Sequence, residues 1–307
     1  MLSLLVALDQ TRLQPWVYQY LLLLIITALY YRQSDPQQST RISLLALQLI
    51  VASLYLWGGI QKLNYSFSHE VLPQILGSLQ NGFTLNQSQL SALGVAVAMV
   101  ETLIGCGLIF KKTRTLSVWL ALGMHGLILG LLIVQCRNSV VWMWNAALIF
   151  IVVVLFWRSD TSLVPVFSYW RAANTSGRLS IILAVLCAVL PVLSFRGWWD
   201  MYLSGGLYSG NTVIAVMRVD GRLYDKLPEV AKSQVFATKS GEQMLPLFEW
   251  SMADLNVPPY PEPRVFRQVA RGVCALAGES DAELIMKDSP AIMDGSYGIT
   301  RVDCSLL

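Results

Sequence analysis

The pattern of apolar and polar residues changes near residue 200. Before it, uninterrupted apolar runs recur, most of them about 18 residues or longer, which is enough to cross the hydrocarbon core of a bilayer as a helix. After it, apolar and polar residues are mixed and no such run occurs. The sequence therefore predicts an all-α polytopic membrane helical bundle over residues 1–200 and a small soluble α+β domain over residues 201–307.

Six runs are candidate membrane spans, and the first is the shortest. They cover residues 16–31, 42–60, 88–110, 115–134, 139–157 and 178–195. Between the second and third runs, residues 69–83 carry apolar side chains at partly helical spacing. We expect that segment to lie at the membrane interface or to re-enter the membrane.

Composition agrees with this division. Only 13% of the residues are charged and 55% are hydrophobic, whereas soluble domains carry about 25% charged residues. Residues 1–200 hold 12 Lys/Arg and 6 Asp/Glu, and residues 201–307 hold 10 and 13. The basic residues are scattered and form no stripe, so the lipid bilayer is the expected partner and no nucleic acid is expected.

The basic residues predict an orientation in the membrane. Eight of them follow the first, third and fifth runs, and four lie on the opposite side before residue 201. Because positively charged loops stay in the cytoplasm, we expect an integral protein of the plasma or inner membrane. Its N-terminus, Lys62 and C-terminal domain would be extracytoplasmic.

The tail contains recognisable elements and two cysteines. Residues 212–219 and 296–307 have strand-like patterns, and residues 262–278 have apolar residues at helical spacing. Cys274 and Cys304 are the only cysteines after residue 200. An extracytoplasmic location favours a disulfide between them. Two reduced, buried thiols are the alternative.

Two ionisable residues lie near the middle of neighbouring runs. Glu101 is 13 residues before Arg114 and His125 is 11 residues after it, so an antiparallel helical hairpin would place both at similar depth. Such residues inside a span usually face the bundle interior and have a partner. We expect a Glu101–His125 hydrogen bond, which would either tie the two helices together or relay protons.

Lys62 stands at the outer end of the second run, directly after an apolar stretch that contains Gly58 and Gly59. A lysine at this position is ordinarily a snorkelling anchor at the membrane surface. The adjacent glycines permit close backbone approach, and the residues that follow are polar but uncharged. The second interpretation is a reactive group at the mouth of a cavity.

Other polar and aromatic residues are expected on the same outer side. Asn145 lies one or two turns into the fifth run, beside Trp142 and Trp144, and Asp200 follows the sixth run. We predict that these residues line a substrate-binding cavity above Glu101 and His125. The chain has two histidines and no CxxC or HExxH motif, so no metal site is expected.

Three segments resemble a known family of membrane domains. YLWGGIQKLNYSF (55–67) is similar to the aromatic–x–x–Gly–φ–x–Lys–Leu segment of the HTTM domain, which is shared by vitamin K-dependent gamma-carboxylases and many bacterial proteins. VETLIGCGLIFKKTRTLSVWLALGMHGLIL (100–129) resembles the Glu-to-His helical hairpin of HTTM and DoxX-like proteins, and NSVVWMWN (138–145) resembles the entry to the next helix. The resemblance covers residues 42–157. It implies that Lys62 matches the catalytic base of the carboxylases on the lumenal side.

Two functions remain open from the sequence. The first is a membrane enzyme that acts on a lipid-soluble or quinone-like molecule, in which an apolar wall favours the neutral amine of Lys62 as the base while His125 and Glu101 relay protons. The second is a non-catalytic membrane subunit or scaffold that anchors the extracytoplasmic domain and binds another membrane protein. Solute transport is disfavoured because no pair of interrupted, repeated spans is present.

Overall fold

The computed structural model describes residues 10–32, 35–77, 85–136, 138–163, 166–277 and 281–307. The chain forms two compact units. The helical unit comprises residues 15–210, and the terminal domain combines residues 211–307 with residues 10–14. The sequence placed this boundary after residue 200. It lies ten residues later because the turn before residue 211 packs on the helices, where Asn64 Nδ2 donates to Ser209 O at 2.8 Å.

The helical unit contains five helices that are long and apolar enough to cross a membrane. They are α3 (Pro36–Gln61), α5 (Gln87–Ile109), α6 (Lys111–Val134), α7 (Ser139–Phe156) and α9 (Thr175–Val189) with its extension η4 (Leu190–Arg196). Each overlaps one of the last five predicted runs.

The first predicted run forms α2 (Pro15–Tyr30), a shorter apolar helix of 16 residues. At about 1.5 Å per residue it extends roughly 24 Å, less than the roughly 30 Å of a hydrocarbon core. By length and composition the described residues thus provide five candidate spans and one shorter apolar helix, where the sequence predicted six spans of which the first was the shortest.

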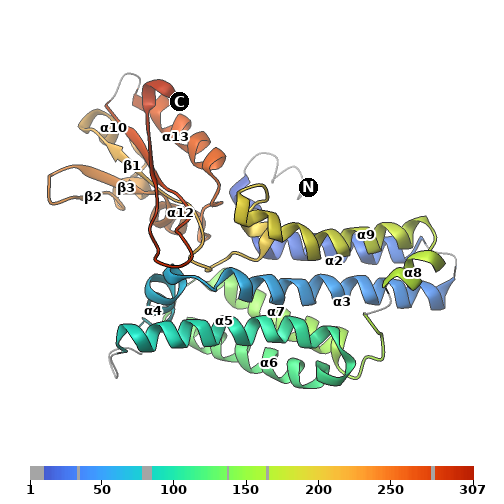
Figure 1. Ribbon diagram of the computed structural model, residues 1–307. Helices are drawn as coiled ribbons and strands as arrows, with labels where there is room; N and C mark the ends of the chain where they lie inside the picture. Colours follow the sequence, from blue (N-terminus) through green and yellow to red (C-terminus); the bar gives the residue numbers. More distant parts are fainter. Residues whose placement is uncertain (1–9, 33–34, 78–84, 137, 164–165, 278–280) are drawn as a thin grey trace. The chain divides into compact units, whose positions relative to one another are not determined.

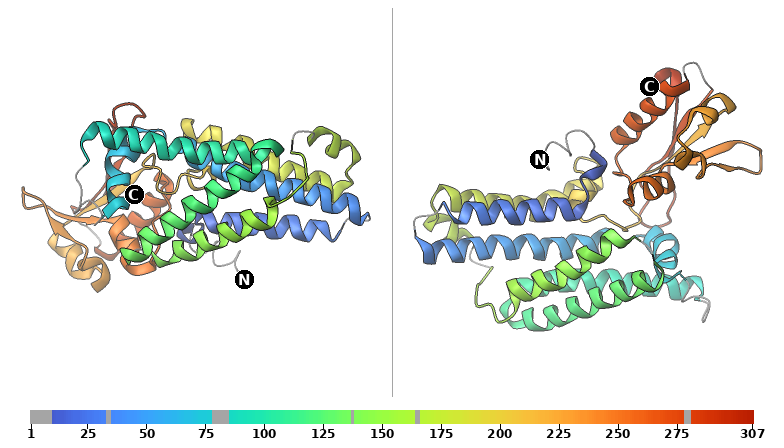
Figure 2. Two further views of the ribbon diagram at one scale, coloured as in Figure 1. Left: turned by 90° about the horizontal axis from the view of Figure 1, so that it is seen from below. Right: turned by 180° about the vertical axis from the view of Figure 1, so that it is seen from behind.

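Helix α3 is the centre of the helical unit. It packs against α2 and α9 on one side and against α5 and α7 on the other, and α6 packs on α5 and α7. Figures 1 and 2 show the two groups of helices on opposite sides of α3. Side chains of α3 therefore build the interior on both sides, with Ala46 and Ile50 facing α2 and α9 and with Val51 and Tyr55 facing α5, α6 and α7.

The ends of α3 follow from local sequence. Asp35 accepts hydrogen bonds from the backbone N–H groups of Gln37 and Gln38, with Pro36 at the first helical position. At the other end, Lys62 is the C-cap. Asn64 then accepts from Phe67 N at 2.8 Å and starts the segment that contains η2 (Phe67–Val71) and α4 (Leu72–Leu76). The lysine thus sits where the long helix stops.

Glycines allow α3 and α5 to approach closely. A Cβ on Gly59 would lie 2.4 Å from Thr102 N, and one on Gly105 would lie 2.4 Å from Leu56 N. The small-residue pair Gly126 and Gly130 of α6 has no such function, because a Cβ at either position meets no atom of the described chain within 4 Å. The tight contact is therefore between α3 and α5.

The terminal domain contains a five-stranded antiparallel sheet with the order β2-β3-β1-β4-β5. Its strands are β1 (Ile214–Val219), β2 (Phe236–Ala237), β3 (Gln243–Pro246), β4 (Glu283–Lys287) and β5 (Ile299–Asp303). Its helices are α10 (Gly221–Lys226), α11 (Glu229–Lys232), α12 (Leu247–Leu255) and α13 (Pro263–Ala277). The predicted strands at residues 212–219 and 296–307 and the predicted helix at residues 262–278 are confirmed by β1, β5 and α13.

The predicted disulfide is also present. Cys274 in α13 is bonded to Cys304, which follows β5, with Cα atoms 5.6 Å apart and 30 residues of separation. Met217, Leu245, Phe266 and Leu284 form part of the buried core between sheet and helices. The bridge therefore joins the main helix of the domain to its last strand next to that core.

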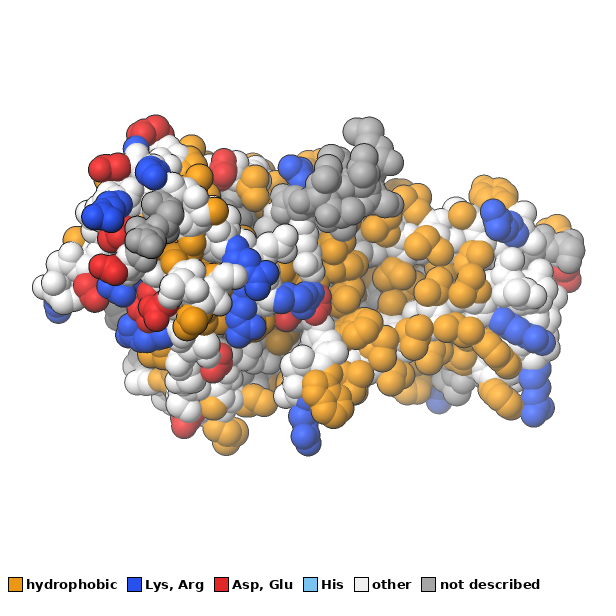
Figure 3. All heavy atoms as spheres, turned by 90° about the horizontal axis from the view of Figure 1, so that it is seen from above, with side chains coloured by type: hydrophobic (Ala, Val, Ile, Leu, Met, Phe, Trp, Pro, Cys, Tyr) orange, Lys and Arg blue, Asp and Glu red, His pale blue; other side chains and the backbone are white. Residues whose placement is uncertain are grey.

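The surfaces of the two units differ in chemistry. In Figure 3 apolar side chains gather on the helical unit, whereas charged side chains are concentrated on the terminal domain and at an end of the helices. Large apolar side chains such as Trp119, Leu127, Met143 and Phe150 are between 60% and 73% exposed. An apolar surface of this extent on helices of membrane length suits contact with lipid.

Candidate functional site

Lys62 and Glu101 form an ion pair between the end of α3 and the middle of α5. Lys62 Nζ lies 2.6 Å from Glu101 Oε2 and also donates to Gly58 O at 3.1 Å. The two side chains are 14% and 15% exposed. The pair is therefore mostly covered by protein, and a small part of each side chain is accessible at the surface.

Gly58 makes room for this pair. A Cβ on Gly58 would lie 2.6 Å from Glu101 Oε1, so a larger residue would displace the carboxylate. Positions 58 and 62 are one helical turn apart on the same face of α3. The spacing of Gly58 and Lys62 in the sequence thus builds a niche for a carboxylate from the neighbouring helix.

A second polar cluster joins α3, α6 and α7. His125 Nε2 lies 2.6 Å from the hydroxyl of Tyr55, and His125 Nδ1 lies 2.8 Å from Asn145 Oδ1. All three residues are buried, with Tyr55 1%, Asn145 4% and His125 5% exposed. Every polar side-chain atom in this cluster has a hydrogen-bond partner, as burial demands.

The hydrogen bonds define the tautomer of His125. Asn145 Nδ2 donates to Val141 O at 2.9 Å, so the amide oxygen of Asn145 faces the imidazole and accepts from Nδ1–H. Nε2 then carries the lone pair and accepts the proton of the Tyr55 hydroxyl. The cluster is a directed chain that runs from Tyr55 through His125 to Asn145.

The expected hydrogen bond between Glu101 and His125 is not formed. Glu101 bonds to Lys62 and His125 bonds to Tyr55 and Asn145. The physical reason is that each side chain finds a different partner on α3: Glu101 from α5 bonds to Lys62, and His125 from α6 bonds to Tyr55. Glu101 still acts electrostatically on both Tyr55 and His125, so the pair and the cluster are neighbours.

The other predicted site residues divide between this region and elsewhere. Asn145 is in the His125 cluster, where it bonds to His125 Nδ1 and to Val141 O. Trp144 Nε1 donates to Gln19 Oε1 at 2.6 Å and packs its ring against Trp16, so it faces α2. Trp142 is half-buried near the start of α7, and Asp200 is half-buried in the turn before η5 (Tyr202–Ser204).

Tyr55 is the site residue that sequence reasoning missed. It lies seven residues before Lys62, with Gly58 and Gly59 between them at spacings of three and four from Tyr55. Positions with this spacing share one face of a helix. That regularity was the available signal, but a tyrosine in an apolar run is too common to draw attention alone.

These residues offer proton-transfer chemistry and no evident metal site. Among the residues that the structure describes, no group of three or more His, Cys, Asp or Glu side chains could hold a metal ion. The groups present are an amine, a carboxylate, an imidazole and a phenol, all of which gain and lose protons.

No protein-family model, curated protein or solved structure matches this chain. The resemblance of residues 42–157 to HTTM and DoxX-like membrane domains therefore stays a prediction.

Proposed function

We propose that the chain is an integral membrane protein whose helical unit acts as an acid–base enzyme on a lipid-soluble or quinone-like molecule, with Lys62 as the base. The observation that carries this proposal is the contact of 2.6 Å between Lys62 Nζ and Glu101 Oε2 at the end of a helix of membrane length. Ionisable residues in such helices are costly and usually serve a function.

The ion pair can supply a neutral amine without creating net charge. Transfer of one proton from Lys62 Nζ to Glu101 Oε2 converts ammonium and carboxylate into an amine and a carboxylic acid. A site with little water favours such neutral partners more than bulk water does. The amine can then take a proton from an O–H group of a bound molecule, which leaves that molecule as an anion beside the new ammonium group.

The His125 cluster supports the same chemistry. His125 Nε2 has a lone pair directed at the Tyr55 hydroxyl, and Glu101 acts electrostatically on both groups. While Glu101 is ionised, its carboxylate would stabilise a proton that arrives at Nε2, and the Lys62 ammonium would oppose it. Asn145 holds the ring in the required orientation through Nδ1, so we assign it a positioning role.

The alternative is a non-catalytic membrane subunit that anchors the terminal domain and binds another membrane protein. It is favoured by one observation: Lys62 Nζ bonds to both Glu101 and Gly58 O, as in a clamp that joins α3 to α5. In that case the side chain at position 62 needs only a positive charge to pair with Glu101 and does not have to accept a proton.

Arginine at position 62 distinguishes the two functions. Arginine keeps a positive charge and can pair with Glu101, but it has no lone pair with which to accept a proton. The purified protein in lipid nanodiscs would be titrated with decylubiquinol, and calorimetry in buffers of different ionisation enthalpy would report binding and proton transfer together. We expect Lys62→Arg and Lys62→Ala to weaken binding by at least about tenfold, the factor that corresponds to about 1.4 kcal/mol.

Lys112→Ala is the matched control, because this exposed lysine of α6 lines none of the site. It should bind the quinol like the unmodified chain. If Lys62→Arg binds and transfers protons normally, and Lys62→Ala loses only thermal stability, the clamp is the correct function and the enzyme proposal fails.

A further inference from the structure

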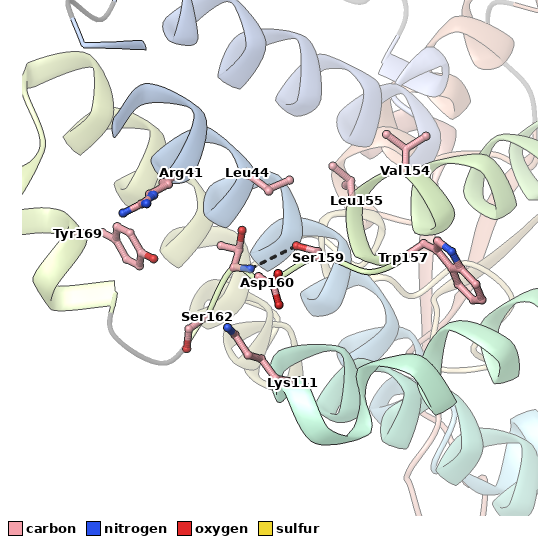
Figure 4. Close-up of a pocket in the computed structure, with 11 residues that line it drawn as sticks. Arg41, Leu44, Lys111, Val154, Leu155, Trp157, Ser159, Asp160, Ser162 and Tyr169 are labelled. Carbon is pink, nitrogen blue, oxygen red and sulfur yellow. Dashed lines mark hydrogen bonds between the residues drawn. The ribbon is translucent and has the colours of Figure 1, made fainter. Parts of the chain in front are cut away.

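A pocket with basic and apolar walls lies in the helical unit, separate from Lys62 and His125. It has a volume of about 560 Å³, within the ordinary range of small-molecule sites. It is enclosed by the first turns of α3 and α6, the last turn of α7, the following loop and α8 (Val166–Ala172). Figure 4 shows side chains from these elements around one hollow.

Two basic side chains at this pocket have no partner of opposite charge. Arg41 enters from α3 and Lys111 from α6. Both are exposed, and neither forms an ion pair or side-chain hydrogen bond within the described part of the chain. Asp160 is the one acidic residue of the lining, so the lining carries a net positive charge.

A buried arginine that is not itself part of the lining supports the loop that lines the pocket. The Arg114 side chain is 3% exposed and donates to the backbone oxygens of Ser159 at 2.8 Å and Thr161 at 2.9 Å. It thereby holds the loop after α7 in place and adds a third positive charge. With Arg41 and Lys111 against Asp160, the region has a net charge of about +2 at neutral pH.

Hydroxyl groups and an apolar wall complete the pocket. Ser162 and Tyr169 stand beside the basic residues, whereas Val154, Leu155 and Trp157 line the side toward the body of α7. Val154 is 59% and Trp157 38% exposed, so this wall continues into the apolar outer surface of the helix. The cationic and hydroxyl side chains can bind an anionic group. The apolar wall can bind hydrocarbon chains that are attached to that group.

We propose that this pocket binds the phosphate headgroup of an anionic phospholipid. Arg41 and Lys111 would contact the phosphate, the hydroxyls of Ser162 and Tyr169 would donate to its oxygens, and an acyl chain would lie along Val154 and Trp157. Basic pockets between membrane helices near the membrane surface recognise such headgroups. A free inorganic anion would use the charges but would gain nothing from the apolar wall.

The test uses the full chain in mild detergent with phosphatidylglycerol, phosphatidylcholine or inorganic phosphate as the probe. Binding is read from the shift in thermal midpoint as each probe is titrated, because a ligand of the folded state stabilises it. We expect phosphatidylglycerol to bind well, phosphatidylcholine weakly and inorganic phosphate weakly. Arg41→Gln/Lys111→Gln should weaken phosphatidylglycerol binding about 30-fold, since each basic residue near an anionic lipid contributes about fivefold.

Two further variants make the result specific. Lys112→Gln/Arg158→Gln removes the same charge from exposed neighbours that do not line the pocket, and it should leave affinity within about twofold. Asp160→Asn removes the carboxylate of the lining and should strengthen binding. Equal losses in both double variants, equal binding of phosphatidylcholine, or inorganic phosphate binding as tightly as the lipid would each overturn the proposal.

Discussion

The Tyr55 hydroxyl depends on His125 for its hydrogen bond, because both groups lie in the interior between α3 and α6. Tyr55→Phe would keep the ring and leave His125 Nε2 buried without a donor. We expect the free energy of unfolding to fall by about 1–3 kcal/mol, the usual cost of an unsatisfied buried group. Denaturant titration of the protein in detergent micelles measures this change.

Tyr65→Phe is the control for that substitution. The Tyr65 hydroxyl accepts an exposed hydrogen bond from Gln87 Nε2 at 2.9 Å, so its loss should change stability by no more than about 0.5 kcal/mol. If Tyr65→Phe destabilises the protein as much as Tyr55→Phe, the buried cluster has no special energetic role.

Sequence reasoning singled out four of these residues, whose functional role stays a prediction, and it assigned one hydrogen-bond partner wrongly. Lys62, Glu101, His125 and Asn145 attract attention because polar groups in apolar runs are rare and costly. Depth along the hairpin placed Glu101 near His125, yet depth alone does not say which helix face each residue occupies. A third helix, α3, supplies Lys62 as the partner of Glu101 and Tyr55 as the partner of His125. The sequences of the two runs that contain Glu101 and His125 do not reveal the contribution of this third helix.

At the scale of elements, the contact between α3 and α5 depends on Gly59. Gly59→Ala would bring a Cβ within 2.4 Å of Thr102 N and 2.6 Å of Ala98 O. Because these are backbone atoms, the helices must move apart, and we expect a loss of about 1–3 kcal/mol, typical of overpacking. Gly126→Ala meets no described atom within 4 Å and should be neutral or stabilising by up to about 1 kcal/mol. Unfolding in detergent compares the two, and an equal loss would contradict the packing argument.

The disulfide ties the end of the chain to α13. Cys274 and Cys304 close a loop of about 30 residues, which in the chain-entropy model stabilises the folded state by about 3–4 kcal/mol. We expect thiol-specific alkylation of the denatured protein to label Cys106, Cys136 and Cys187 without reductant and all five cysteines after reduction. Intact mass gives the count. Labelling of all five before reduction would show that the bridge is absent.

Helices and strands were predictable where the surroundings of one element alone determine its pattern of apolar and polar residues. Apolar runs marked helices α2, α3, α5, α6, α7 and α9, and helical spacing marked α13. β4 (Glu283–Lys287) was not predicted, because it lies between two other strands and its sequence ELIMK does not alternate between buried and exposed positions. β2 has only two residues, too few for a pattern. Such strands are defined by pairing with neighbours rather than by local sequence.

At the scale of the whole molecule, one hydrogen bond constrains the topology. Gln14 Nε2 donates to Pro258 O at 2.8 Å within the terminal domain, so in a membrane-inserted chain residues 10–14 would lie on the same side of the membrane as that domain. If the five long helices each cross once, residue 35 and the terminal domain lie on opposite sides. We infer that α2, between residues 14 and 35, must cross as well.

The short length of α2 does not forbid this crossing. A bilayer thins around a helix that is a few ångströms too short, at a modest cost. We therefore expect six crossings, with residues 10–14 and the terminal domain together on one side. The excess of basic residues at the other ends of the helices predicts that this side is outside the cytoplasm.

Single cysteines at three positions test this topology in a chain whose free cysteines have been replaced by alanine at Cys106, Cys136 and Cys187. The replacements Arg12→Cys, Lys112→Cys and Ser240→Cys would be exposed to a membrane-impermeant maleimide in intact cells. Positions 12 and 240 should be labelled from outside, and position 112 only after permeabilisation. Opposite results for positions 12 and 240 would show that α2 does not cross. External labelling of position 112 alone would show that the orientation is the reverse of the predicted one. The disulfide would then lie in a reducing compartment, where such bridges rarely persist.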